Sequence, residues 1–205
     1  MSIGSKLKLK VYEKLGTAFT IIRDSGNVTG EYLDYEINKQ VTKPFIREYF
    51  LEAEMAYDTV AVVGDVIQFD DSRTFLVMNK TPDHFKNVPI KYECVFYKAN
   101  VSGEVLRPSG ESWSSQTYHK EQQWETVKEN CYALETEALF GHDLDADQEL
   151  GMLNLKEDEL YIPSSVNIQV NDRYQPVSGE YNRVEVVKKR RFDGVDVCEL
   201  GEDHR

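Results

Sequence analysis

Apolar and polar residues alternate along much of the chain, as they do in half-buried β-strands. Near its start, Leu7, Leu9 and Val11 alternate with lysines, which predicts a strand over residues 6–11. Further strands are predicted at residues 19–22, 59–63, 66–69, 75–78, 92–97, 160–162, 166–170, 184–187 and 195–200. Short strands at this spacing, separated by polar turns, predict a mainly β protein built from small barrels or sandwiches.

Two segments fit a helix as well as a strand. The first is residues 45–57. The second, residues 119–139, could form the one convincing helix, because four residues recur there at helical spacing: Trp124, Val127, Cys131 and Leu134. Alternatively, a strand already begins at Tyr132. Little helix is expected elsewhere.

The middle of the chain differs in composition from its surroundings. Ser, Gly and Pro are frequent between residues 100 and 118, which is typical of a linker or a long exposed loop. We therefore predict a linker at residues 101–126 between two barrel-like domains, an N-terminal one at 1–100 and a C-terminal one at 127–205. The expected fold class is mainly β, with two small barrel- or sandwich-like units, a loop-rich linker and little helix.

A short internal repeat also favours two similar units. Three residues recur at a constant offset of 107 positions, Val63, Asp65 and Gln68 as Val170, Asp172 and Gln175. The same offset carries Val77 onto Val184. In both copies Asp follows Gly or Asn, a pair that suits a turn with positive φ. The repeat therefore predicts a duplicated strand–turn–strand unit.

The charge balance narrows the function. The 205 residues include 36 acidic and 24 basic ones, for a net charge of −12. Tight sequence-neutral binding to nucleic acid depends on Lys and Arg displacing counterions from phosphates, and this chain lacks that overall composition. An acidic surface suits a channel through which DNA slides without sticking, and it suits ordinary solubility equally well.

Membrane and secretion signals are not expected. The first residues lack the apolar core of a signal peptide, and no apolar stretch approaches the roughly 18 residues of a membrane span. The three cysteines, Cys94, Cys131 and Cys198, have no metal-type spacing. We interpret them as buried free thiols of a protein kept in a reducing, cytosol-like compartment.

No motif for catalysis is present among the common nucleotide-binding, hydrolase and metalloprotease patterns. Four scattered histidines are interpreted as surface residues: His84, His119, His142 and His204. Asp143, Asp145 and Asp147 have the spacing of a calcium loop, but Gln148 and Asn154 stand where Gly and Glu are required. We therefore predict a non-enzyme with no catalytic residue, no cofactor and no metal.

Two groups of residues are candidates for contacts with partners. The basic run Lys188-Lys189-Arg190-Arg191 could bind DNA phosphate or an acidic neighbour, or it could protect a strand edge from aggregation. Trp113, Tyr118 and Trp124 could be interface anchors, because aromatic residues dominate contact hot spots, or they could pack in the core.

The repeated segments resemble a known family. They are Gly64–Phe69 followed by Thr74–Val77, and Tyr161–Pro163 through Asn171–Tyr174 with Tyr181 and Val184–Val187, together with the end Cys198–Arg205. These resemble the small barrels of head-closure and head–tail connector proteins in the neck of tailed bacteriophages. Known members are usually shorter, so the doubled barrel departs from the family.

The resemblance implies a structural virion protein that is made in the host cytoplasm and located in the neck or tail. Several copies would self-associate in a ring that contacts portal, adaptor and tail proteins and closes the DNA-filled head. Segment 103–118 would plug the channel, double-stranded DNA would pass without specific binding, and no membrane would be involved. The alternatives are a tail or baseplate protein, a non-viral β-barrel binding module for single strands, or a carboxylate hydrolase using Asp143, Asp145 and Asp147.

Overall fold

The computed structural model describes residues 2–36, 49–116, 118–136, 159–177 and 179–203. The chain forms two compact units, Met1–Ala99 with Phe192–Val195, and Asn100–Arg191 with Asp196–Arg205. Each unit contains one six-stranded antiparallel sheet, and helices are few and short. The predicted fold class, mainly β with two β units and little helix, is confirmed.

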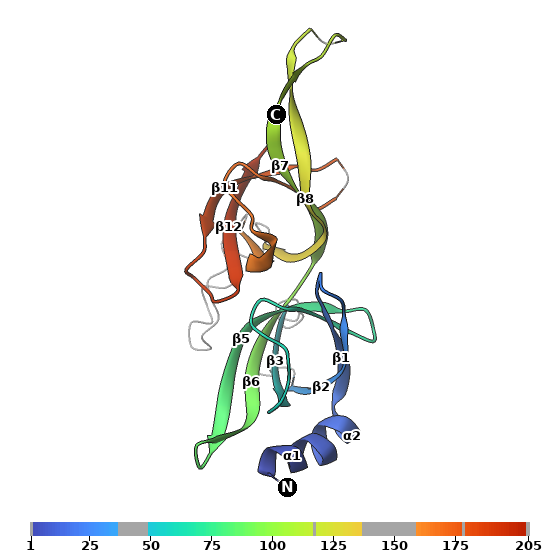
Figure 1. Ribbon diagram of the computed structural model, residues 1–205, viewed down its shortest axis with the longest axis vertical. Coiled ribbons are helices and arrows are strands. Elements are labelled where there is room, and N and C mark those ends of the chain that lie inside the picture. Colours follow the sequence, from blue (N-terminus) through green and yellow to red (C-terminus); the bar gives the residue numbers. More distant parts are fainter. Residues whose placement is uncertain (1, 37–48, 117, 137–158, 178, 204–205) are drawn as a thin grey trace. The chain divides into compact units, whose positions relative to one another are not determined.

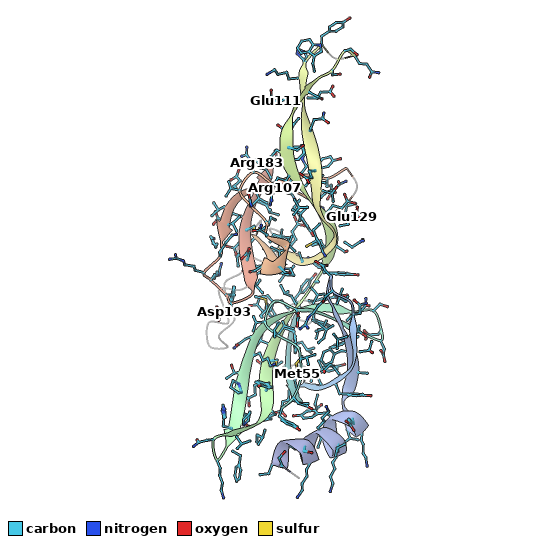
Figure 2. All side chains as sticks on the ribbon, viewed as in Figure 1. Met55, Arg107, Glu111, Glu129, Arg183 and Asp193 are labelled. Carbon is cyan, nitrogen blue, oxygen red and sulfur yellow. The ribbon has the colours of Figure 1, made fainter. Side chains whose placement is uncertain are left out.

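The first barrel contains six strands: β1 (Thr17–Ile22), β2 (Val28–Glu36), β3 (Phe50–Ala56), β4 (Val66–Phe69), β5 (Thr74–Phe85) and β6 (Val88–Lys98). Their order is β1-β2-β3-β6-β5-β4, and β4 pairs with β1 to close the sheet. The other five strands are labelled in Figure 1. Ile21, Leu33 and Met55 are fully buried in its core, and Met55 lies inside the barrel in Figure 2. Closure leaves the barrel without a free sheet edge along the paired residues.

The second barrel contains β7 (Val101–Trp113), β8 (Lys120–Thr136), β9 (Glu159–Pro163), a 3-10 turn η4 (Ser164–Val166), β10 (Arg173–Gln175), β11 (Asn182–Lys188) and β12 (Val195–Glu202). Taken from β7, its order is β7-β8-β9-β12-β11-β10. This is the topology of the first barrel with every strand number raised by six. Leu160, Tyr174 and Val184 are fully buried in its core.

The N-terminal segment is helical, so the strand predicted at residues 6–11 is wrong. Helix α1 (Ile3–Leu7) continues through a π-helical turn, η1 (Lys8–Tyr12), into α2 (Glu13–Leu15). Ser2 caps the helix by accepting a 3.1 Å hydrogen bond from the Ser5 amide. The alternation of lysines with apolar residues suggested a strand. However, Lys6, Lys10 and Lys14 are also four residues apart, and residues at this spacing lie on one face of a helix.

The linker predicted at residues 101–126 is also wrong, because most of this segment belongs to the paired strands β7 and β8. Pro108 and Gly110 flank an irregularity in the pairing, and Gly110 has φ 153°, so the turn-forming residues mark a β-bulge. Of the two alternatives for residues 119–139, the helix is wrong, because Lys120–Thr136 form strand β8, and the strand considered from Tyr132 is confirmed as far as Thr136. Further register shifts on either side of Val105 add residues to β8 and interrupt its two-residue alternation. Because of this interruption, the apolar residues of β8 are spaced as they would be in a helix.

Two other predicted strands, 59–63 and 166–170, are not strands, and they occupy equivalent places before β4 and β10. Val60, Val62 and Val170 are exposed, whereas Ala61 and Ile168, separated by 107 positions, are both fully buried at the cores of their barrels. Residues 50–56 of the ambiguous segment 45–57 form β3, and 45–48 lie outside the described residues.

The internal repeat is visible as one hydrogen-bonded cluster in each barrel, which we call the Asp clasp. In the first barrel, Arg23 Nε donates to Asp65 Oδ1 at 2.9 Å and Arg23 Nη2 donates to the Val60 carbonyl at 2.9 Å. The Val62 amide donates to Asp65 Oδ2 at 2.7 Å. Gly64 precedes the aspartate with φ 88°, as the sequence predicted for this turn.

In the second barrel the same bonds are made by residues 107 positions later, except for the arginine. Arg107 Nε donates to Asp172 Oδ1 at 2.9 Å, and its Nη2 donates to the Asn167 carbonyl at 2.9 Å. The Gln169 amide donates to Asp172 Oδ2 at 2.8 Å, and Asn171 has φ 71°. The repeat is therefore a structural device that joins the first strand of each barrel to the turn before the fourth.

Candidate functional site

The most prominent surface feature is the β7–β8 hairpin, which extends well beyond the rest of the second barrel (Figure 1). β7 has 13 residues and β8 has 17. β10 pairs with β7 only at Glu104–Leu106, and β9 pairs with β8 only at Leu134–Thr136. We call residues 108–113 and 120–124, with the turn between them, the arm. Glu111 lies along it (Figure 2), and its carboxylate pairs with Lys120 at 3.0 Å.

The tip of the arm carries two aromatic side chains that the barrel does not cover. Trp113 is 66% exposed and Tyr118 is 73% exposed. The turn is held by main-chain bonds, from the Ser114 amide to the His119 carbonyl at 2.9 Å and from the Tyr118 amide to the Ser114 carbonyl at 3.0 Å. Tyr118 adopts φ 55°. Such exposed rings on a projecting element are suited to contact with another molecule.

Trp124, the third aromatic residue proposed as an anchor, lies at the base of the arm. Its ring stacks on the guanidinium of Arg173, 3.8 Å from the ring centroid, and Tyr181 lies 4.5 Å from the same guanidinium. Arg173 Nε also donates to the buried carboxylate of Asp203 at 2.7 Å. Trp124 therefore fixes the arm to its barrel, whereas Trp113 and Tyr118 are free to contact a partner.

The basic run is divided between the interior and the surface of the second barrel. Glu159 is fully buried, and its carboxylate accepts bonds from Lys188 Nζ at 3.0 Å, Arg191 Nη1 at 3.2 Å and the Tyr161 hydroxyl at 2.9 Å. Charge-assisted bonds of this kind offset the cost of burying a carboxylate. Two of the four basic residues thus have an internal structural role, while Lys189 and Arg190 are exposed.

The first barrel carries a groove of about 620 Å³ on its outer surface, which we call the acidic groove. Four carboxylates line it, Asp34, Glu52, Glu54 and Glu93, with Asn79 and Thr81. Strand register brings them together: Glu54 on β3 lies directly opposite both Asp34 on β2 and Glu93 on β6. Like charges in directly opposed positions destabilise a sheet.

One ammonium partly compensates for these charges. Lys91 Nζ bonds to Glu54 and lies 3.6 Å from Glu93. The bond to Glu54 raises the pKa of Lys91. The sequence alone does not reveal this groove, because its carboxylates are ordinary polar positions of separate strands. Only the strand register shows that they lie side by side.

The residues tested for chemistry do not assemble into a site within the part of the chain that the structure describes. No group of three or more His, Cys, Asp and Glu side chains there is arranged to hold a metal ion. His84 lies near the end of β5 and His119 at the tip of the arm, both exposed. Asp143, Asp145, Asp147, His142 and His204 lie outside the described residues.

The three cysteines are buried free thiols, as predicted. Burial raises the pKa of Cys94 to about 12, and it raises the pKa of Cys198 to the same value. Such thiols are poor nucleophiles, because the thiolate is the reactive form. Cys94 and Cys198 therefore belong to the cores of their barrels.

Within the described residues, no helix is both long and apolar enough to span a membrane. Comparison with protein-family models, with curated proteins and with solved structures found no match to this chain. The candidate site therefore rests on geometry alone: it is the aromatic tip of the arm, and the acidic groove is a second candidate surface.

Proposed function

We propose that the protein is a non-enzymatic structural subunit that joins a larger particle through its arm. The observation that carries this proposal is the projecting β7–β8 hairpin, which ends in the exposed rings of Trp113 and Tyr118. The arm has a rigid base, because Trp124 is stacked on a buried ion pair. An anchored ribbon with an aromatic tip can enter a pocket of a partner with little loss of conformational entropy.

We propose the neck of a tailed bacteriophage as the setting. The support is the resemblance of the two repeated segments, which form the Asp clasps and the strands that follow them, to head-closure and head–tail connector proteins. In this proposal several copies form a ring, contact portal or adaptor and tail proteins, and let double-stranded DNA pass without specific binding. The net charge of −12 is consistent with such passage, since like charges repel.

The test is electron microscopy of particles made by a phage that carries this gene with a stop codon. Separate tails beside emptied heads are expected. Complementation with wild-type protein should restore tailed particles, and complementation with the Trp113→Ser/Tyr118→Ser variant should not. The matched control is Phe85→Ser/Val88→Ser, which changes the exposed apolar tip of the other hairpin, β5–β6.

Intact, DNA-filled and tailed particles without the protein would overturn the proposed setting. Restoration of particles by the Trp113→Ser/Tyr118→Ser variant would show that the arm tip is not the joining surface. Immunogold labelling of wild-type particles separates the neck from the tail tip, where a baseplate protein would be found.

A further inference from the structure

The N-terminal helical segment presents a basic surface on an otherwise acidic molecule. Lys6, Lys10 and Lys14 are exposed and lie four residues apart, so they project from one side of the helix. Ile3 and Leu9 of the same segment are also exposed, at 46% and 41%. We call these five side chains the basic helix face. In a chain of net charge −12, these three lysines outnumber the one acidic residue of the segment, the exposed Glu13, and give a local excess of positive charge.

The opposite side of the helix is fixed to the first barrel. Tyr12 is buried, and its hydroxyl donates to Glu54 Oε2 at 3.2 Å. Gly4 packs so closely on the Tyr57 ring that a Cβ atom there would lie 2.9 Å from ring carbons. Lys8 is held by Asp58 at 2.8 Å. The helix is therefore a rigid part of the surface, and its exposed face is presented in one orientation.

The acidic groove has the complementary charge. Of its four carboxylates, Glu54 bonds to the ammonium of Lys91 and Glu93 lies 3.6 Å from it. Glu52 and Glu93 are exposed, so they are open to a cation from outside. A further cation would reduce the repulsion between carboxylates that the strand register places directly opposite one another.

We propose that the basic helix face of one copy docks into the acidic groove of a second copy. Charge complementarity identifies the occupant, since lysines on the helix match the carboxylates, and Ile3 and Leu9 supply apolar contact around them. Every copy carries both surfaces, so the contact can close as a pair or continue around a ring. This inference rests on the proposed function only in requiring an assembling subunit, and it names the surfaces through which copies meet.

The experiment exchanges the charges of the two surfaces in the full-length protein. Lys6→Glu/Lys10→Glu makes both surfaces acidic, and Glu52→Lys/Glu93→Lys makes both basic. Sedimentation velocity at low salt should show self-association of the wild-type chain. Each variant alone should self-associate with an affinity lower by a factor of about ten or more. Mixing the two variants should restore association as a mixed complex, because each surface then meets its opposite.

The matched control for Lys6→Glu/Lys10→Glu is Lys189→Glu/Arg190→Glu, which changes the net charge by the same amount at exposed positions of the second barrel. It should associate like wild type. A variant that combines Lys6→Glu/Lys10→Glu with Glu52→Lys/Glu93→Lys in one chain should regain self-association. This result would show that the substitutions at each surface leave the protein folded. Added salt should weaken wild-type association, because exposed charges are screened.

Three results would overturn the proposal: a monomeric wild-type chain at low salt, undiminished association of either variant, or no association in the mixture. Vesicles of anionic lipid provide the competing outcome. If wild type binds them and Lys6→Glu/Lys10→Glu does not, while self-association is unchanged, the helix face is a lipid contact. Failure here leaves the arm-tip test in particles unaffected, so the two proposals fail separately.

Discussion

The two barrels have the same strand order and the same Asp clasp, but they extend different hairpins. In the first barrel β5 and β6 are the long pair, with 12 and 11 residues, and β1 and β2 have 6 and 9. In the second barrel the equivalents of β1 and β2, which are β7 and β8, have 13 and 17, and β11 and β12 have only 7 and 8.

This difference distinguishes the strand residues that the barrel fold requires from those that can vary in length. Closure of the sheet and the clasp need only the short stretch of each strand that lies in the barrel. Residues beyond that stretch have no core to fill, so they can change in length and composition. The first barrel uses this freedom for a hairpin tipped by Phe85 and Val88, and the second for one tipped by Trp113 and Tyr118.

The largest expected effect is on the clasp. Asp172→Ala should lower the free energy of unfolding of the second barrel by about 3 to 4 kcal/mol, because it leaves Arg107 and the Gln169 amide without their acceptor. Asp65→Ala should cost less in the first barrel, since Asp65 is 9% exposed and Asp172 only 1%. Urea unfolding followed by circular dichroism measures both.

Asparagine at either position is the control for the clasp, because it keeps one acceptor oxygen and should recover part of the loss. Equal losses for the two alanine variants would contradict the difference in burial as the cause.

A smaller loss is expected at the base of the arm. Trp124→Ala should destabilise the second barrel by about 2 kcal/mol, because a ring that covers the guanidinium of Arg173 is removed. Trp124→Phe keeps a ring in this position and should lose about half as much. The same urea titration measures it, and an unchanged midpoint for Trp124→Ala would show that the stacking does not hold the arm.

The buried thiols should make both barrels less stable in alkali. The pKa of Cys94 and of Cys198 is about 12 in the folded chain, and an unfolded thiol ionises near about 8.5. The unfolded state therefore releases protons first, and stability falls as pH rises from about 8.5 toward 12. At pH 10 the expected loss is about 1 to 2 kcal/mol for each thiol.

Unfolding titrations between pH 8 and pH 10 measure this slope. Cys94→Ala and Cys198→Ala should each remove part of it, one from each barrel. If the double alanine variant loses stability with pH as steeply as wild type, groups other than these two thiols cause the loss.

The smallest effect on stability is expected at the tips of the hairpins. Trp113→Ser/Tyr118→Ser and Phe85→Ser/Val88→Ser should each change the free energy of unfolding by less than about 0.5 kcal/mol, because exposed side chains contribute little to the core. Thermal unfolding measures this. A larger loss in the first pair would mean that these rings pack against the protein itself.

Much of the β structure follows from the sequence because the barrel strands are short apolar runs, either alternating as in β3 or buried on both faces as in β9. Seven strands overlap predicted segments for this reason: β1, β4, β5, β6, β9, β11 and β12. The arm was missed because both of its faces are exposed, so its strands carry no alternation, and its Ser, Gly and Pro suggested a loop. Trp113 and Tyr118 could be proposed as contact residues from their residue type, but their exposure could not be predicted.

The apolar pattern by itself indicated that this protein is mainly β, and the internal repeat indicated two similar units and located the aspartates of the clasp. Only the tertiary structure decided their partners, since Arg23 lies 42 residues from Asp65 and Arg107 lies 65 residues from Asp172. The acidic groove depended on it in the same way. Sequence patterns report local burial, whereas ion pairs and surfaces formed across strands depend on which strands are neighbours and on their register.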